Sequence, residues 1–170
     1  MEQYHTILKE QEEENATNLL TKHNIVCRQM QFGNEAPLYL AKPHWTNRFD
    51  AERDSTIGIF FSIWVSPKLI EQGRFAYNIH SKQLSKLTGY KLKPRKFADE
   101  FRLAVEARVA DWPGIRMDYG PSTLLQGHDT CDLDSFAEKV ADRVSEFVGI
   151  HEEIDSLLAR STTQANETNP

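Results

Sequence analysis

The stretch that most constrains the fold is "IGIFFSIWV" at residues 57–65, which is apolar on both of its alternating sides. Successive side chains of an extended strand point to opposite faces, so Ile59 and Phe61 share one face while Phe60 and Trp64 share the other. A strand with two apolar faces belongs in the interior of a sheet, where both faces are covered. The run is far too short to cross a bilayer. We therefore expect the central strand of a soluble, layered domain.

The rest of the chain predicts strands and helices around this strand. Further strands are expected at residues 25–31, 37–45, 74–82, 115–119 and 123–127. Helices are expected at residues 2–23, from Pro94 to the "WPG" of 112–114, and at 132–160. A polar loop is expected at 46–55 and a turn at 66–73. This order predicts one α+β domain over residues 1–160, with a mostly antiparallel sheet of about five to six strands and helices on one face.

The last helix has the clearest pattern. We expect Asp132 to cap its start. Its apolar seam follows a regular 4-3 spacing and consists of Leu133, Ala137, Val140, Val144, Phe147, His151, Ile154 and Leu158. A helix of this length measures roughly 40 Å, which is longer than a small domain needs.

The length of this seam raises the question of what covers it. If the sheet covers only part, Phe147, Ile154 and Leu158 are left exposed, and pairing with a second copy would bury them. We therefore expect a homodimer through the C-terminal helix. The alternative is that the N-terminal helix lies antiparallel along the seam. His151 is either a pH-sensitive or register-setting position of this seam, or a histidine at the edge of the packing with its tip in water.

Three further features bear on the class of protein. Residues 161–170 contain no large apolar side chain and are expected to form a disordered tail. The acidic start of the chain lacks the apolar core of a signal peptide. Cys27 and Cys131 form neither a disulfide framework nor a zinc motif, and the histidines lack metal-ligand spacing. We expect a cytoplasmic protein that binds no membrane, metal or cofactor.

Positive charge is concentrated in one segment of an otherwise acidic chain. The net charge is −5, yet residues 80–102 carry seven Lys and Arg against two acids, while residues 103–170 carry five against thirteen. Two explanations are open: the basic segment binds an anionic partner, or the acidic C-terminal helix neutralises it. The side chains expected to bind an anion are Tyr90, Lys91, Lys93, Arg95 and Lys96.

A second candidate site is the wetter face of the sheet. Asn78 and His80 share a face of one expected strand, and Arg116 and Asp118 share a face of another. If those strands are neighbours, His80, Asp118 and Arg116 could act as base, acid partner and anion holder, with Phe60 and Trp64 as an apolar wall. The alternative is an ordinary solvated sheet face.

The sequence contains no recognisable catalytic or nucleotide-binding motif. The function we expect is therefore a non-enzymatic binding module that works through protein contacts and an anionic ligand at residues 82–96. Two alternatives stay open: a small enzyme that uses the polar sheet face, and a nucleic-acid accessory protein that uses the basic segment.

Overall fold

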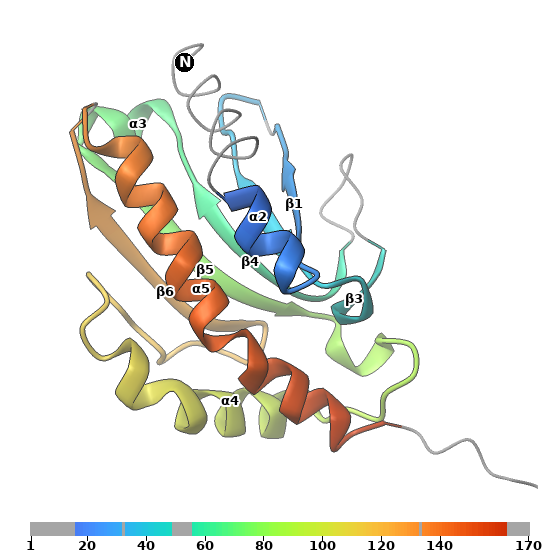
Figure 1. The fold of residues 1–170 in the computed structure, drawn as a ribbon. Helices are drawn as coiled ribbons and strands as arrows, with labels where there is room; N and C mark the ends of the chain where they lie inside the picture. Colours follow the sequence, from blue (N-terminus) through green and yellow to red (C-terminus); the bar gives the residue numbers. More distant parts are fainter. Residues whose placement is uncertain (1–15, 32, 49–55, 133, 163–170) are drawn as a thin grey trace, which may run out of the picture.

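The computed structural model describes residues 16–31, 33–48, 56–132 and 134–162, and every structural statement below concerns these residues (Figure 1). The elements in chain order are α2 (Ala16–Lys22), β1 (Val26–Gln29), β2 (Leu38–Ala41), the 3-10 turn Pro43–Trp45, β3 (Thr46–Arg48), β4 (Ile57–Trp64), α3 (Pro67–Glu71), β5 (Arg74–Lys82), the 3-10 turn Leu84–Lys86, α4 (Pro94–Val109), β6 (Thr123–Thr130) and α5 (Phe136–Ala159).

The strands form one six-stranded antiparallel sheet. Its order is β1-β2-β4-β5-β6, and the short strand β3 pairs with part of β4. The stretch that begins at Ile57 is the central strand, as predicted, because β4 has β2 on one side and β5 on the other. Phe60 and Phe61 point to opposite faces, and each is almost fully buried. The α+β class and the antiparallel sheet are thus confirmed.

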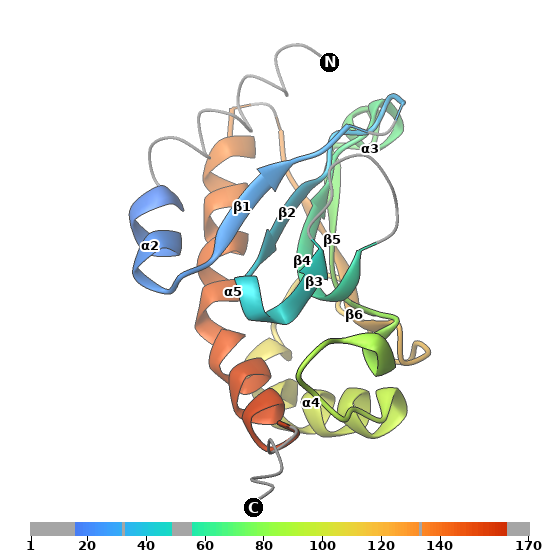
Figure 2. The same ribbon diagram turned by 90° about the vertical axis from the view of Figure 1, so that its right-hand side faces the viewer.

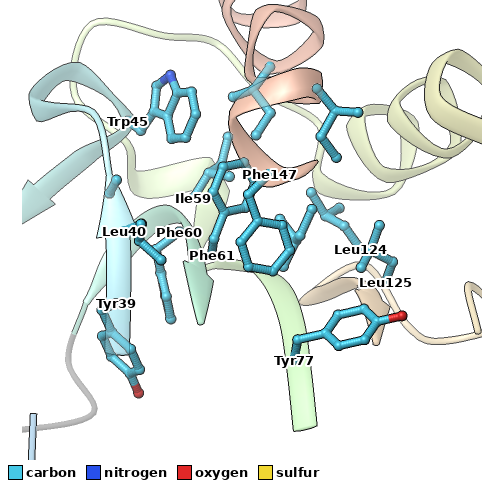
Figure 3. Close-up of a cluster of buried hydrophobic side chains, with 14 of the residues drawn as sticks. Tyr39, Leu40, Trp45, Ile59, Phe60, Phe61, Tyr77, Leu124, Leu125 and Phe147 are labelled. Carbon is cyan, nitrogen blue, oxygen red and sulfur yellow. The ribbon is translucent and has the colours of Figure 1, made fainter. Parts of the chain in front are cut away.

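The helices α2 and α5 lie on the same side of the sheet, and α4 crosses below its lower end (Figure 2). The core between sheet and helices is aromatic. Phe61 of β4 stacks on Phe147 of α5 with ring centroids 4.6 Å apart (Figure 3). Phe75 of β5 meets Phe136 edge to face. Phe101 of α4 is also fully buried. No helix in the described ranges is long and apolar enough to cross a membrane.

The seam of α5 is covered within the chain. Phe147, Ile154 and Leu158 are at most 1% exposed, so the expectation that they would be left open in a single chain is wrong. His151 is also buried, with Nδ1 2.5 Å from the carbonyl oxygen of Val148. The apolar reason for pairing two copies through this helix is therefore absent.

Other expectations about local structure were wrong. Residues 67–71 of the expected turn form the helix α3, because Ser66 accepts a hydrogen bond from the Leu69 amide and Pro67 suits the first helical turn. Residues 115–119 make a single bridge, between Arg116 and Gln126, instead of a strand. The cap of α5 is Ser135, whose amide and hydroxyl both donate to Asp132.

Two residues of the expected tail are part of the fold. Thr162 forms a bridge with Tyr90, and the hydroxyl of Ser161 donates to the carbonyl oxygen of Leu157. The first three residues of the loop expected at 46–55 instead form the strand β3. Four expectations fall on positions outside the described residues: helix formation over 2–15, the rest of that loop at 49–55, the seam position Leu133 and the disordered tail at 163–170.

Gly58 of β4 has no room for a side chain. Its φ is +133°, and a Cβ built there would lie 2.0 Å from the carbonyl oxygen of Trp45. We expect Gly58→Ala to lower the free energy of unfolding by about 2 to 3 kcal/mol. The positive φ at this position is strained for alanine, and the Trp45 carbonyl oxygen leaves no space for a Cβ atom. Urea unfolding followed by circular dichroism measures this loss. Gly120→Ala, where nothing lies within 4 Å, is the control, and equal effects at the two glycines would contradict the assignment.

Candidate functional site

The apolar side chains of the predicted sheet-face site pack inside the protein. The side chain of Ser62 donates to the Asn78 amide oxygen, and the Trp64 indole donates to the Ser62 hydroxyl at 3.0 Å. Phe60 is 1% exposed and lies 5.3 Å from the His80 ring, measured between centroids. These side chains therefore hold one another, and the buried Phe60 ring offers no open wall to a ligand.

The structure does not bring the three predicted catalytic residues together. Arg116 bridges to Gln126 on the outer side of β6, so that β6 lies between it and the strand β5 that carries His80. Arg116 instead forms a two-pronged ion pair with Asp118, at 2.7 and 3.0 Å. The hydrogen bond from Arg116 lowers the pKa of Asp118 and raises that of Arg116, which is what a local pair does.

The basic segment, in contrast, borders a real hollow. The segment before α4 and the end of α5 lie side by side (Figure 1), joined by a hydrogen bond of 2.9 Å from the Lys91 amide to the Ser161 carbonyl. Between them is a hollow of about 490 Å³, here named the basic hollow. Its lining residues are Lys91, Leu92, Lys93, Lys96, Phe97, Glu100, Arg160, Ser161 and Thr162. It contains three of the predicted anion-binding residues, whereas Arg95 and Tyr90 lie outside it.

The neutralisation of this segment by the acidic helix α5 is not seen in the described part of the chain. There, no ion pair joins a cation of residues 82–96 to an acid of α5. Lys96 lies 3.6 Å from Glu100 of its own helix, and both side chains are substantially exposed. The acids of α5 have other partners, since Glu153 pairs with Arg108 and Asp155 pairs with Lys42.

The start of α4 carries positive charge, which is unfavourable at the N-terminal end of a helix. Lys93 is the cap residue, Arg95 and Lys96 follow in the first turn, and that turn contains no acid. The N-terminal end of a helix carries partial positive charge from its unpaired N–H groups, so cations there repel it and an anion is stabilised. The electrostatics of the basic hollow therefore favour an anion.

A second cluster, which the sequence did not reveal, centres on Asp155 of α5. Its carboxylate accepts three hydrogen bonds from one short segment: from Lys42 Nζ at 2.5 Å, His44 Nε2 at 2.9 Å and Trp45 Nε1 at 2.8 Å. Burial opposes ionisation of Asp155, but these donors outweigh it and the pKa of the carboxyl is lowered. The donors all lie in "KPHW", yet their acceptor is more than a hundred residues away, so no sequence spacing could have indicated the cluster.

The Asp155 cluster borders a hollow of about 540 Å³, here named the His44 hollow. Its lining residues are Pro43, His44, Thr46, Asn47, Leu87, Thr88, Gly89, Tyr90 and Thr162. Asn47 holds one wall in place, because its amide donates to the Lys86 carbonyl at 2.8 Å and accepts from the Thr88 amide at 2.7 Å. Among the described residues, no group of three or more His, Cys, Asp and Glu could hold a metal ion.

Comparison with protein-family models, with curated proteins and with solved structures found no match. The functional argument therefore depends on the two hollows and the side chains that line them.

Proposed function

We propose that this protein is a non-enzymatic binding module whose ligand carries an anionic group, bound in the basic hollow. The observation that supports this most directly is the lining: Lys91, Lys93, Lys96 and Arg160 surround one hollow, and Glu100 is its only acid among the residues that the structure describes. These cations come from two segments that are far apart in sequence. Folding therefore gathers like charges at one place, which costs free energy unless an anion is bound there.

The size and chemistry of the basic hollow suit a phosphate or carboxylate group. Its volume is within the usual range for small-molecule sites, roughly 300 to 1,000 Å³. Three flexible lysines act as point charges, and Arg160 adds a planar fork that binds two oxygens of a phosphate or carboxylate. The lining side chains of Leu92 and Phe97 are buried, and they anchor the segment from which the lysines extend.

This proposal keeps two expectations from the sequence. The cytoplasmic location is consistent with the two cysteines, which are both free thiols. Nucleic acid remains an alternative ligand, because its backbone offers the same phosphate chemistry. The acidity of the whole chain, at −5, favours a small anion over a long polyanion.

The test compares two triple variants with the same change of charge. Lys91→Gln, Lys93→Gln and Lys96→Gln together remove three cations of the basic hollow. Lys22→Gln, Lys68→Gln and Lys139→Gln remove three cations elsewhere. We expect wild type and the control variant to bind inorganic phosphate or to be retained on heparin at low ionic strength, and the hollow variant to lose this binding at least tenfold. Calorimetry measures the binding of phosphate, and chromatography measures retention on heparin.

The outcomes separate the ligand classes. Phosphate binding that weakens only in the hollow variant supports a small-anion site. Retention on heparin and binding of single-stranded DNA with little affinity for phosphate would assign the site to nucleic acid. Equal losses in both triple variants would show that only net charge is involved, and no binding by wild type would overturn the proposal.

A further inference from the structure

We propose that the His44 hollow is a second binding site, whose ligand is a small uncharged ring compound with a hydroxyl group. This inference does not rest on the proposed function, because it uses a different hollow and different side chains. It depends on the hydrogen bond between His44 and Asp155, which determines which ring nitrogen of His44 can accept a hydrogen bond from a ligand.

In the neutral form of His44, the ionised Asp155 determines which ring nitrogen carries the proton. A carboxylate only accepts hydrogen bonds, so the ring nitrogen 2.9 Å from Asp155 Oδ1, which is Nε2, must donate. The other nitrogen, Nδ1, then keeps its lone pair and is an acceptor. Lys42 and Trp45 bind the same carboxylate, and both are at least nine-tenths buried, so the orientation of the carboxylate is fixed.

The remaining walls of the hollow select for an uncharged ring. Pro43, Leu87 and the ring of Tyr90 supply apolar and aromatic surface. Burial, and then the negative charge of Asp155, raise the pKa of Tyr90, so its hydroxyl stays protonated and can donate as well as accept. Asp155 is paired with Lys42, so this cluster adds no unpaired positive charge that would bind a ligand anion. A neutral ligand with one O–H group would instead donate to His44 Nδ1 and lay its ring against Pro43 and Tyr90.

The hollow is formed before a ligand arrives. Asn47 pins residues 86 and 88 through both ends of its amide, and Thr162 forms a bridge with Tyr90 on the opposite wall. A preformed site loses little conformational entropy when the ligand binds. A single hydrogen bond and one ring face nevertheless predict weak binding, with a dissociation constant on the order of 1 mM.

The experiment compares two probes that differ in the hydroxyl. Phenol has a ring and an O–H donor, while anisole has a ring and no donor. We expect phenol to bind wild type about tenfold more tightly than anisole, measured by NMR titration with nitrogen-15 shifts of the histidine rings. The shifts should show neutral His44 with its proton on Nε2, and phenol should perturb Nδ1 of His44.

Variants assign the effect to His44. His44→Phe keeps a ring but has no acceptor in place of Nδ1, while Lys42 and Trp45 still bind Asp155. The tenfold preference for phenol should therefore disappear. His128→Phe, the same change at an exposed histidine on β6, should leave the preference intact. Equal binding of the two probes by wild type, an unchanged preference in His44→Phe, or no binding at 50 mM phenol would each overturn the proposal.

Discussion

Replacing Phe147 by alanine is expected to lower the free energy of unfolding by about 3 to 5 kcal/mol, the usual cost of emptying a buried phenylalanine site. Phe147 is fully buried and stacks on Phe61 with an interplanar angle of 17°. It also meets Tyr77 and Trp112 edge to face, so the cavity would lie between the sheet, α5 and the segment that follows α4. The three rings that surround Phe147 are held by their own packing, so they cannot move in to fill the cavity.

Denaturant unfolding measures this loss, with Leu103→Ala as the matched control. Leu103 is 77% exposed on α4, so its truncation should change stability by less than about 0.5 kcal/mol. A midpoint for Phe147→Ala close to that of the control would show that the seam of α5 is not the centre of the core.

The burial of Phe147 changes how the dimer prediction can be tested. A glutamate there would place an unpaired charge in the core and unfold the chain, so it could not report on an interface. The oligomeric state of wild type is measured by sedimentation against the monomer mass of 19.6 kDa. A dimer would have to use other surfaces than Phe147, Ile154 and Leu158.

The sequence predicted the length and pattern of α5 but not what covers it. The 24 residues of α5 span roughly 36 Å, while the eight residues of β4 span roughly 26 Å. The sheet therefore ends before the helix does, as expected. The helix also packs against α4 and against α2, the described end of the expected N-terminal helix, where the rings of His23 and His151 meet. Its last residues meet the segment near Tyr90, whose position depends on a connection that carries no periodic pattern.

Local patterns were reliable where one physical effect dominated. The two apolar faces of residues 57–64 required a central strand, and Pro94 marked the start of α4, as observed. Alternation over only five residues at 115–119 was not sufficient evidence for a strand, because Arg116 alone bridges to β6. The turn predicted at 66–73 contains a Ser-Pro helix start, and the helix α3 forms there instead.

The candidate sites divide in the same way. Lys91, Lys93 and Lys96 could be identified from the sequence because charge concentrates in one segment. Arg160, which completes the basic hollow, and the contact between His44 and Asp155 could not. Both bring the C-terminal part of α5 together with residues far away in sequence, and only the packing of α5 against the sheet and α4 places these residues side by side.

A buried ion pair provides the second large effect. Arg143 of α5 is 2% exposed, and its Nη2 donates to Asp129 of β6 at 3.1 Å, while Nη1 lies 2.5 Å from Glu146 Oε2. Its guanidinium lies 4.1 Å from the Tyr77 ring centroid and 4.9 Å from that of Trp112. Two aromatic faces and two carboxylates thus replace part of the water that this cation loses on folding. Within the described part of the chain, its Nε and Nη1 are buried without a hydrogen-bond partner.

Arg143→Met is expected to lower the free energy of unfolding by about 3 to 5 kcal/mol at pH 7, because it leaves the carboxylate of Asp129 buried without a partner. The control is Arg108→Met, which breaks a half-exposed pair with Glu153 and should cost at most about 1 kcal/mol. The shift of the urea unfolding midpoint, at an unchanged dependence of the unfolding free energy on urea, measures the loss of stability in each variant. Similar losses at the two arginines would contradict the assigned burial of Arg143.

Asp129→Asn added to Arg143→Met separates the cost of the stranded charge from the cost of lost packing. Asparagine has nearly the same shape as aspartate but no charge, so the double variant should regain part of the stability that Arg143→Met loses. If it regains nothing, the loss comes from the contacts of Arg143 with Tyr77 and Trp112. Those rings also contact Phe147, so the ion pair and the aromatic core would then stabilise α5 on the sheet as one unit.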